Sequence, residues 1–238
     1  MNRGDINILE RQVIEFRHNV GLNDSEAVNL KSLLLKLNVL TIFRPLSNDF
    51  SGMSLKSPTG NRFMLINSRH PLGRQHYTIG HELYHLFIEK NPKPHSCTPS
   101  APKSDSEQRA NQFASMLLMP VAAITQLIPT TELQNNEISL ATVIKLEHYF
   151  SVSRKAIVHR LSFLKLITKS QFEYFNSLPA IKTAKEYGYD TVLYQPGNEG
   201  LVIGDFGEKA RQLLDNGKIS EGHYRELMNK IGINVDEN

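Results

Sequence analysis

Two histidines and a glutamate lie close together in the segment HELYH at residues 81–85. On a helix, residues four apart lie one turn above each other on nearly the same face, so both imidazoles can reach one ion. Glu82 lies beside that face, where it can hold and deprotonate a water instead of entering the coordination shell. The spacing therefore predicts a metal site with His81 and His85 as ligands and Glu82 as the general base.

A catalytic zinc ion has three protein ligands and one open position, so a third ligand must come from elsewhere in the chain. Three downstream residues compete for this role: His95, Cys97 and Glu107. The extended metalloprotease pattern with Gly and His at fixed offsets is excluded, because Ile88 and Asn91 stand at those positions. His95 and Cys97 fall in a Pro-rich stretch, a surface loop in which ligand geometry is hard to hold.

Glu107 lies on the apolar stripe of a predicted helix that runs from about residue 106 to 118. A carboxylate that faces the core costs free energy unless it is paired or bound to metal. The alternative is a capping box, S-x-x-E, that Glu107 would form with Ser104 at the start of the helix. We favour Glu107 as the third ligand, with Asn111 one turn later supporting a ligand histidine.

Helices and short strands must position these residues. Apolar spacing predicts helices over 7–20, 27–37 and 71–90, and strands at 39–43 and 63–66 that pair in one small sheet. An enzyme that acts on an extended polypeptide can bind it as an added strand at a sheet edge, so we suggest 63–66, the strand immediately before the HELYH helix, as the substrate-pairing edge if the site hydrolyses peptides. Full pairing of that strand inside the sheet is the equally weighted alternative.

Two further helices, within residues 138–168, resemble a helix-turn-helix. The second helix carries a basic cluster that offers contacts to phosphates, namely Arg154, Lys155, His159 and Arg160. Glu147 and the small net charge argue against direct DNA binding. The last segment, 171–238, contains helical patches and two short apolar runs, 191–194 and 201–203, that suggest a hairpin around Pro196-Gly197.

Composition limits the class of protein further. The chain has 238 residues and a formal net charge of +3, too small to argue for a nucleic-acid or membrane partner by bulk charge. One cysteine, Cys97, cannot form a disulfide within the chain, as expected in a reducing compartment. Residues 1–15 lack the apolar run of a signal peptide, and no stretch is apolar enough to span a bilayer. We therefore expect a cytoplasmic protein without a membrane partner.

Residues 76–86, HYTIGHELYHL, resemble the signature helix of the ImmA/IrrE metallopeptidases. Glu107 with the following ANQFA and LLMP is similar to their second signature, and the resemblance covers roughly residues 5–170. It implies a gluzincin-like zinc peptidase with His81, His85 and Glu107 as ligands and Glu82 as the catalytic base. Members typically cleave a partner transcriptional repressor.

The chain departs from this family pattern at two positions. Tyr84 stands where the family commonly has Gly, and Glu89 stands where a histidine is frequent. Neither change removes a ligand, and packing beneath the helix is the favoured role of Tyr84. Tyr77, Tyr84 and His76 lie near the motif, but none is assigned to the oxyanion, and no substrate-binding residue is assigned.

The expected fold class is α+β: a zincin-like, mostly helical metallopeptidase core with a small β-sheet, a helix-turn-helix-like segment and a small C-terminal α/β tail. The expected boundaries are 1–130, 131–170 and 171–238, the last of unknown function.

The predicted activity is that of a zinc-dependent endopeptidase that cleaves a partner protein, a helix-turn-helix transcriptional repressor, by means of Glu82-activated water on the metal. One Zn²⁺ is the expected cofactor, although Mn²⁺ and Fe²⁺ also accept histidine and carboxylate ligands. The alternative function is a non-proteolytic regulatory or toxin-antitoxin module that acts by binding protein or DNA.

Overall fold

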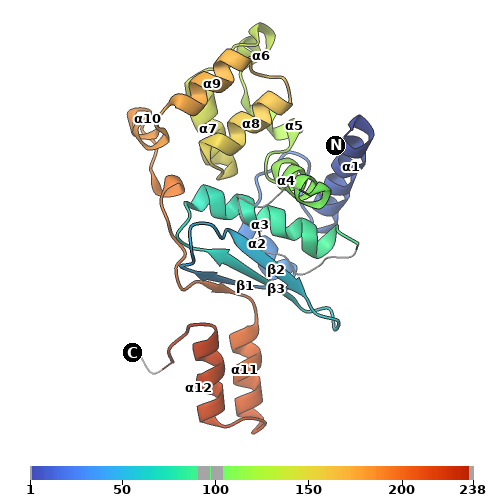
Figure 1. Cartoon of the computed structure of the whole chain (residues 1–238), viewed down its shortest axis with the longest axis vertical. Helices are drawn as coiled ribbons and strands as arrows, with labels where there is room; N and C mark the ends of the chain where they lie inside the picture. Colours follow the sequence, from blue (N-terminus) through green and yellow to red (C-terminus); the bar gives the residue numbers. More distant parts are fainter. Residues whose placement is uncertain (1, 91–96, 98–103, 236–238) are drawn as a thin grey trace.

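The computed structural model of the chain describes residues 2–90, 97 and 104–235. Helices dominate these residues, and they surround one small four-stranded sheet (Figure 1). The expected α+β, zincin-like fold class is confirmed. None of the helices in the described ranges has the length and apolar character needed to cross a bilayer.

The sheet has the strand order β2-β3-β1-β4. Its strands are β1 (Val39–Arg44), β2 (Gly52–Lys56), β3 (Arg62–Asn67) and β4 (Val202–Ile203). Strand β3 pairs in parallel with β1 and antiparallel with β2, so both of its edges are occupied. The suggestion that residues 63–66 form a substrate-pairing edge is therefore wrong, because that strand lies inside the sheet. The outer strand beside it is β2, which the sequence did not predict.

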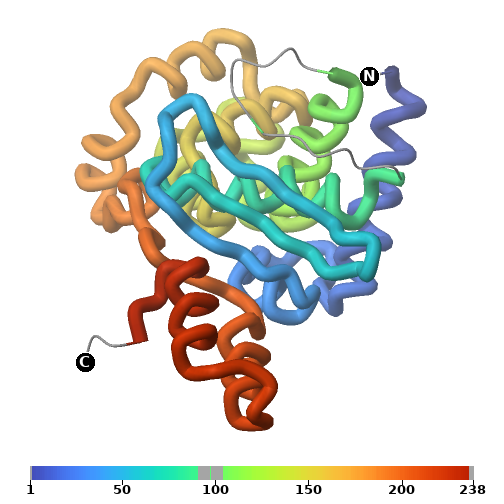
Figure 2. The backbone as a smooth tube through the Cα atoms, turned by 60° about the horizontal axis from the view of Figure 1, so that its bottom comes forward, coloured from blue at the N-terminus to red at the C-terminus, as the bar shows by residue number. Residues whose placement is uncertain are grey.

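The two faces of the sheet bury different side chains because successive residues of a strand point to opposite sides. In β1, Val39 and Phe43 belong to the main core, while Ile42 packs with Ala210 and Met228 on the other face. That second face is covered by α11 (Phe206–Asp215) and α12 (Glu221–Lys230). Figure 2 shows these C-terminal helices, in red, on the side of the sheet away from the rest of the helices.

The main core is built by helices on the first face. The N-terminal pair is α1 (Arg3–Asn19) and α2 (Leu30–Lys36). At the centre lie α3 (Leu72–Phe87), which runs along the sheet, and α4 (Asp105–Leu118), which packs on α3. The remaining helices of this face are α5 (Val121–Leu127), α6 (Thr130–Asn135), α7 (Leu140–Phe150), α8 (Arg154–Phe163), α9 (Lys169–Ser177) and α10 (Ala180–Glu186).

Two buried arginines hold the C-terminal end of α4. The Arg17 guanidinium donates to the carbonyl of Leu117 at 2.6 Å, and Arg160 donates to the carbonyl of Met119 at 3.1 Å. The last carbonyls of a helix lack partners within the helix and carry partial negative charge, so cations stabilise this end. These contacts hold α4 at its C-terminal end, which lies just before Pro120.

The basic cluster at 154–160 does not form one exposed surface. Arg154 is buried, forms an ion pair with the buried Glu147 and donates to Thr183, and Arg160 is buried beneath α4. Lys155 and His159 are the exposed members of the cluster. Helices α7 and α8 nevertheless form the expected pair, joined by a turn in which Ser151 has a φ of 52°.

The predicted hairpin of the C-terminal segment is wrong. Residues 192–194 form a short 3-10 turn, and β4 pairs with β1 instead of with its own neighbour in sequence. The intervening segment lies across the start of α3, where the buried Gln75 side chain donates to the Gly197 carbonyl at 2.9 Å and accepts from Asn198 at 3.0 Å. The main core contains residues from α1 through β4, and the division at 130 and 170 stays a prediction.

Gly73 is required where α3 meets the turn between α7 and α8. A Cβ at this position would lie 2.7 Å from the backbone nitrogen of Ser153 and 2.9 Å from the carbonyl carbon of Val152. Because backbone atoms cannot rotate away, we expect Gly73→Ala to lower the free energy of unfolding by about 1–3 kcal/mol, measured by urea denaturation. Gly222→Ala is the matched control, since Gly222 also occupies the second position of a helix and a Cβ there would lie no closer than 3.9 Å to a neighbouring atom, the Ser220 Oγ. Equal stability of the two variants would contradict this role of Gly73.

Candidate metal centre

The two histidines of the HELYH segment meet on one face of α3. Both side chains are almost fully buried, and their Nε2 atoms lie 3.2 Å apart. This follows from the helical spacing of four residues, which stacks the two rings one turn apart. The structure therefore brings His81 and His85 to one point, as the sequence pattern requires.

Glu107 reaches the same point from α4. Its two carboxylate oxygens lie 3.3 Å from His81 Nε2 and 3.5 Å from His85 Nε2. Ser104 caps the helix by accepting from the Glu107 backbone N–H at 3.2 Å, while the Glu107 carboxylate turns to the imidazoles. The close approach of the two helices depends on Gly80, since a Cβ there would lie 3.2 Å from Ala114 Cβ.

The separations between these donor atoms suit a tetrahedral metal ion. Two ligand atoms that each lie 2.0–2.1 Å from a zinc ion, at a tetrahedral angle, are about 3.3 Å apart. The distances from Nε2 to Nε2 and from Nε2 to carboxylate oxygen are 3.2, 3.3 and 3.5 Å. Two imidazole nitrogens and one carboxylate are also the donors of several catalytic zinc sites. The residues present therefore fit a metal ion.

A second set of contacts fixes the tautomer of each histidine. His81 Nδ1 lies 3.2 Å from Asn111 Oδ1, and His85 Nδ1 lies 2.8 Å from a Glu89 carboxylate oxygen. Both partners are acceptors, so each Nδ1 carries a proton and each Nε2 is the atom turned toward the cluster. Ser106 in turn donates to Glu89. The sequence had suggested Asn111 for this support but gave no role to Glu89.

The electrostatics of the cluster favour positive charge at His81. Burial alone lowers the pKa of His81, but contacts with Cys97 and Glu107 outweigh burial and raise that pKa to about 10. Hydrogen bonds from His81 and His85 hold the pKa of the Glu107 carboxyl well below its usual range. A proton or a metal ion can supply the charge that these surroundings favour.

Glu82 lies beside the three donors and is fully buried. Its carboxylate accepts a hydrogen bond of 2.7 Å from the Ser54 hydroxyl, which comes from the middle of β2. The outer strand of the sheet and the HELYH helix are thus joined at this carboxylate. Sequence reasoning missed Ser54, because β2 itself was not predicted.

The aromatic and histidine neighbours of the motif are engaged elsewhere. The Tyr77 hydroxyl donates to the Asn111 carbonyl at 2.7 Å, and burial raises its pKa to about 12. His76 Nδ1 contacts the Ser151 carbonyl at 2.8 Å. Tyr84 is buried, with its ring 5.8 Å from that of Phe113, in the packing role expected for it.

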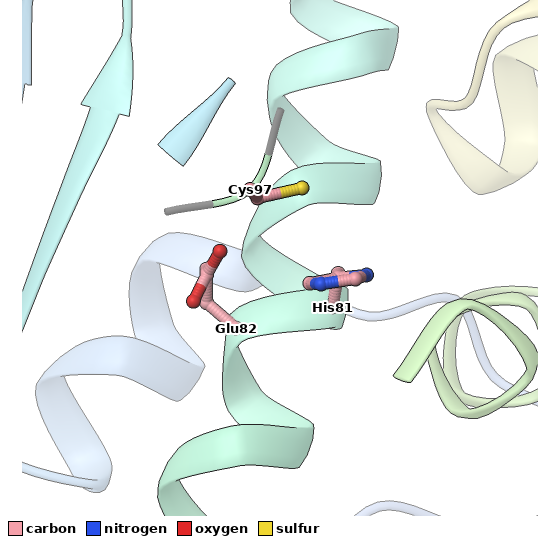
Figure 3. Close-up of side chains that lie close together, drawn as sticks. All are labelled: His81, Glu82 and Cys97. Carbon is pink, nitrogen blue, oxygen red and sulfur yellow. The ribbon is translucent and has the colours of Figure 1, made fainter. Parts of the chain in front are cut away.

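Cys97 lies at the cluster, although the sequence argument had set it aside as a loop residue. Its thiol sulfur and the ligand atoms of His81 and Glu82 all lie within 4.8 Å of one another. Figure 3 shows the Cys97 side chain, from a separate segment beside α3, next to these two residues. The other loop candidate, His95, lies outside the described residues. No spacing rule in the sequence could have found this contact.

Comparison with known protein families agrees with the fold. The family model described as Peptidase_M78, IrrE N-terminal-like domain, matches residues 35–162, more than half of the chain. The chain therefore belongs to the ImmA/IrrE family. Among curated proteins, no significant match is found. Membership in this family indicates a peptidase of the ImmA/IrrE metallopeptidase type and implies a metal ion.

The contact between Glu89 and His85 leads to a prediction about metal affinity. Glu89→Ala leaves all three donors in place but removes the acceptor that orients the His85 ring. Loss of such a partner typically weakens metal binding by about 10- to 100-fold, and we expect a loss in this range, measured by competition with a chromogenic chelator. Glu173→Ala, which removes an exposed carboxylate on α9, is the control for the change in charge. Unchanged affinity of Glu89→Ala would show that Glu89 has no part in the site.

Proposed function

We propose that the protein is a zinc-dependent endopeptidase in which His81, His85 and Glu107 bind the ion and Glu82 is the general base. The observation that carries this proposal is the buried Glu82 carboxylate, held by Ser54 beside three donors whose spacing suits a tetrahedral ion. A purely structural zinc site has no need of a buried carboxylate next to its ligands.

The bound ion would supply Lewis acidity to the scissile carbonyl and to the attacking water. The residues of the chain do the rest. Ser54 fixes the orientation of the Glu82 carboxylate, which takes a proton from the water and passes it to the leaving amine. Asn111 and Glu89 keep both Nε2 lone pairs turned toward the ion.

Zinc is the proposed metal because two imidazoles and one carboxylate are a common donor set for catalytic zinc. Manganese and iron accept the same donors. Metal analysis of the purified protein, together with activity after reconstitution with each ion, distinguishes them.

We propose that the substrate is an extended polypeptide that pairs with the outer edge of β2. Strand β2 is at the end of the sheet, and its Ser54 touches the catalytic base, so a chain added there would pass the metal site. The proposed partner is a helix-turn-helix transcriptional repressor. Support for this partner comes from the family to which the chain belongs.

The alternative is a regulatory module that acts by binding protein or DNA without proteolysis. Burial of Arg154 and Arg160 weighs against the DNA-binding form, because it removes two of the four basic side chains from the surface. Direct contact with DNA would give an affinity that falls steeply with salt, which a titration at two salt concentrations measures.

Replacement of the general base tests the proteolytic function. We expect Glu82→Gln to bind zinc as the parent does and to leave a helix-turn-helix repressor encoded beside this chain intact, because an amide cannot accept the proton of the water. Cleavage is followed by gel electrophoresis and mass spectrometry, with and without a chelator. Glu15→Gln, at an exposed position on α1, is the control.

Two outcomes would contradict the proposal. One is cleavage by Glu82→Gln at the parental rate, and the other is cleavage that continues at the same rate after the metal is removed. A repressor that is bound but never cut would favour the non-proteolytic alternative.

Loss of the hydrogen bond from Ser54 to Glu82 should lower the activity less than replacement of Glu82 itself. Because a hydrogen bond to a charged group contributes about 1.5–3 kcal/mol, we expect Ser54→Ala to lower kcat by roughly 10- to 100-fold. Zinc content and KM should be unchanged, since Ser54 contacts the base and not the ligands. Ser170→Ala, at an exposed position on α9, is the control. A parental kcat in Ser54→Ala would contradict the positioning role.

A further inference from the structure

The backbone of Cys97 is bound to the outer edge of β2. Its N–H donates to the Gly52 carbonyl at 2.9 Å, and its carbonyl accepts from the Ser51 N–H at 2.9 Å. The two hydrogen bonds form an antiparallel bridge, the geometry by which an added strand binds a sheet edge. Cys97 therefore occupies the beginning of the edge that we propose for the substrate.

The side chain of the same residue points to the metal centre. The sulfur lies within 4.8 Å of a ring nitrogen of His81 and of a carboxylate oxygen of Glu82. The thiol is also in hydrogen-bonding contact with His81. Figure 3 shows that Cys97 faces the side of α3 from which His81 and Glu82 project. The sulfur groups with His81 and Glu82 and is not within 4.8 Å of all three donors of His81, His85 and Glu107. A zinc-bound thiolate and a zinc-bound imidazole nitrogen are about 3.6 Å apart at a tetrahedral angle, so the thiol must turn toward the three donors to take a ligand position.

We propose that the Cys97 thiolate is the fourth ligand of the metal ion and that the peptidase is inactive while this ligand is bound. This inference rests on the metal site of the proposed function. In the ligation step the thiol S–H bond breaks, its proton passes to solvent, a sulfur–metal bond forms and one water leaves the ion. The donor set becomes two imidazoles, one carboxylate and one thiolate, which closes the position that an attacking water needs.

The backbone bridge and the thiol act together. Pairing with Gly52 fixes the Cys97 main chain on the sheet edge, so the sulfur reaches the ion without a large loss of conformational entropy. The same pairing excludes a substrate strand from that part of β2. Cys97 thus blocks both the reactive position and the binding edge, and an active enzyme requires that it leave both.

Cobalt substitution of the full-length protein tests the ligation directly. Co²⁺ replaces zinc in tetrahedral sites and gives visible ligand-field bands when it binds, and a thiolate ligand adds a charge-transfer band in the near ultraviolet. We expect both sets of bands in the parent protein. In Cys97→Ser the charge-transfer band should be lost while the visible bands remain.

The outcomes separate this inference from the proposed function. Visible bands without a charge-transfer band in the parent would overturn the thiolate ligand and leave the zinc peptidase intact. Failure to bind Co²⁺ at all would overturn both, because no metal would be held by His81, His85 and Glu107.

A second measurement uses the parent protein alone and does not depend on the folding of a variant. Cys97 is the one cysteine in the sequence, so iodoacetamide labelling reports on this thiol without interference. We expect loading with Co²⁺ to slow the labelling of Cys97, because a metal-bound thiolate is shielded from alkylation. Equal rates with and without the ion would overturn the proposal. In the repressor cleavage assay, Cys97→Ser should cut faster than the parent, and equal rates would overturn the inhibitory role.

Discussion

The contact between α3 and α4 is the constraint on which the rest of the structure depends. The two imidazoles come from α3 and the carboxylate of Glu107 from α4, and Gly80 leaves room for the close approach of the two helices that brings them together. Arg17 and Arg160 hold the far end of α4 by its carbonyls, so the helix cannot slide along its neighbour. A cation bound at the junction would add a cross-link between two helices in a protein that has one cysteine and hence no disulfide within the chain.

The sheet contributes to the site through the strand at its edge. Strand β3 is enclosed between β1 and β2, and this leaves β2 to face the site with its outer edge. Ser54 on that strand holds the carboxylate of Glu82, the proposed base, and Gly52 two residues earlier holds the backbone of Cys97. The proposed peptide recognition, the proposed orientation of the base and the proposed inhibition thus all depend on one strand of five residues.

The sequence was most informative where the chemistry is local. Helical spacing predicted that the side chains of His81 and His85 lie close together, and the apolar stripe of the helix that became α4 pointed to Glu107. The pairing of the strands could not be predicted from the sequence. Strand β2 is short and half polar, and the second neighbour of β1 is formed by the distant residues 202–203. The exposure of Arg154 and Arg160 was misjudged for the same reason, since their partners lie on distant segments. Glu89 and Ser54 act through His85 and Glu82, and no linear motif records such contacts.

The segment that lies across the start of α3 has a consequence for biosynthesis. Gln75 is bound by Gly197, which follows it by 122 residues, and β4 completes the sheet a few residues later. At a translation rate of about 5–20 residues per second, the helix that carries the histidines leaves the ribosome roughly 6 to 25 s before these partners exist. A nascent chain interrupted in this interval contains every proposed ligand yet lacks the strand and the hydrogen bonds that secure their helix. The packing that secures the proposed metal site is therefore completed late in synthesis.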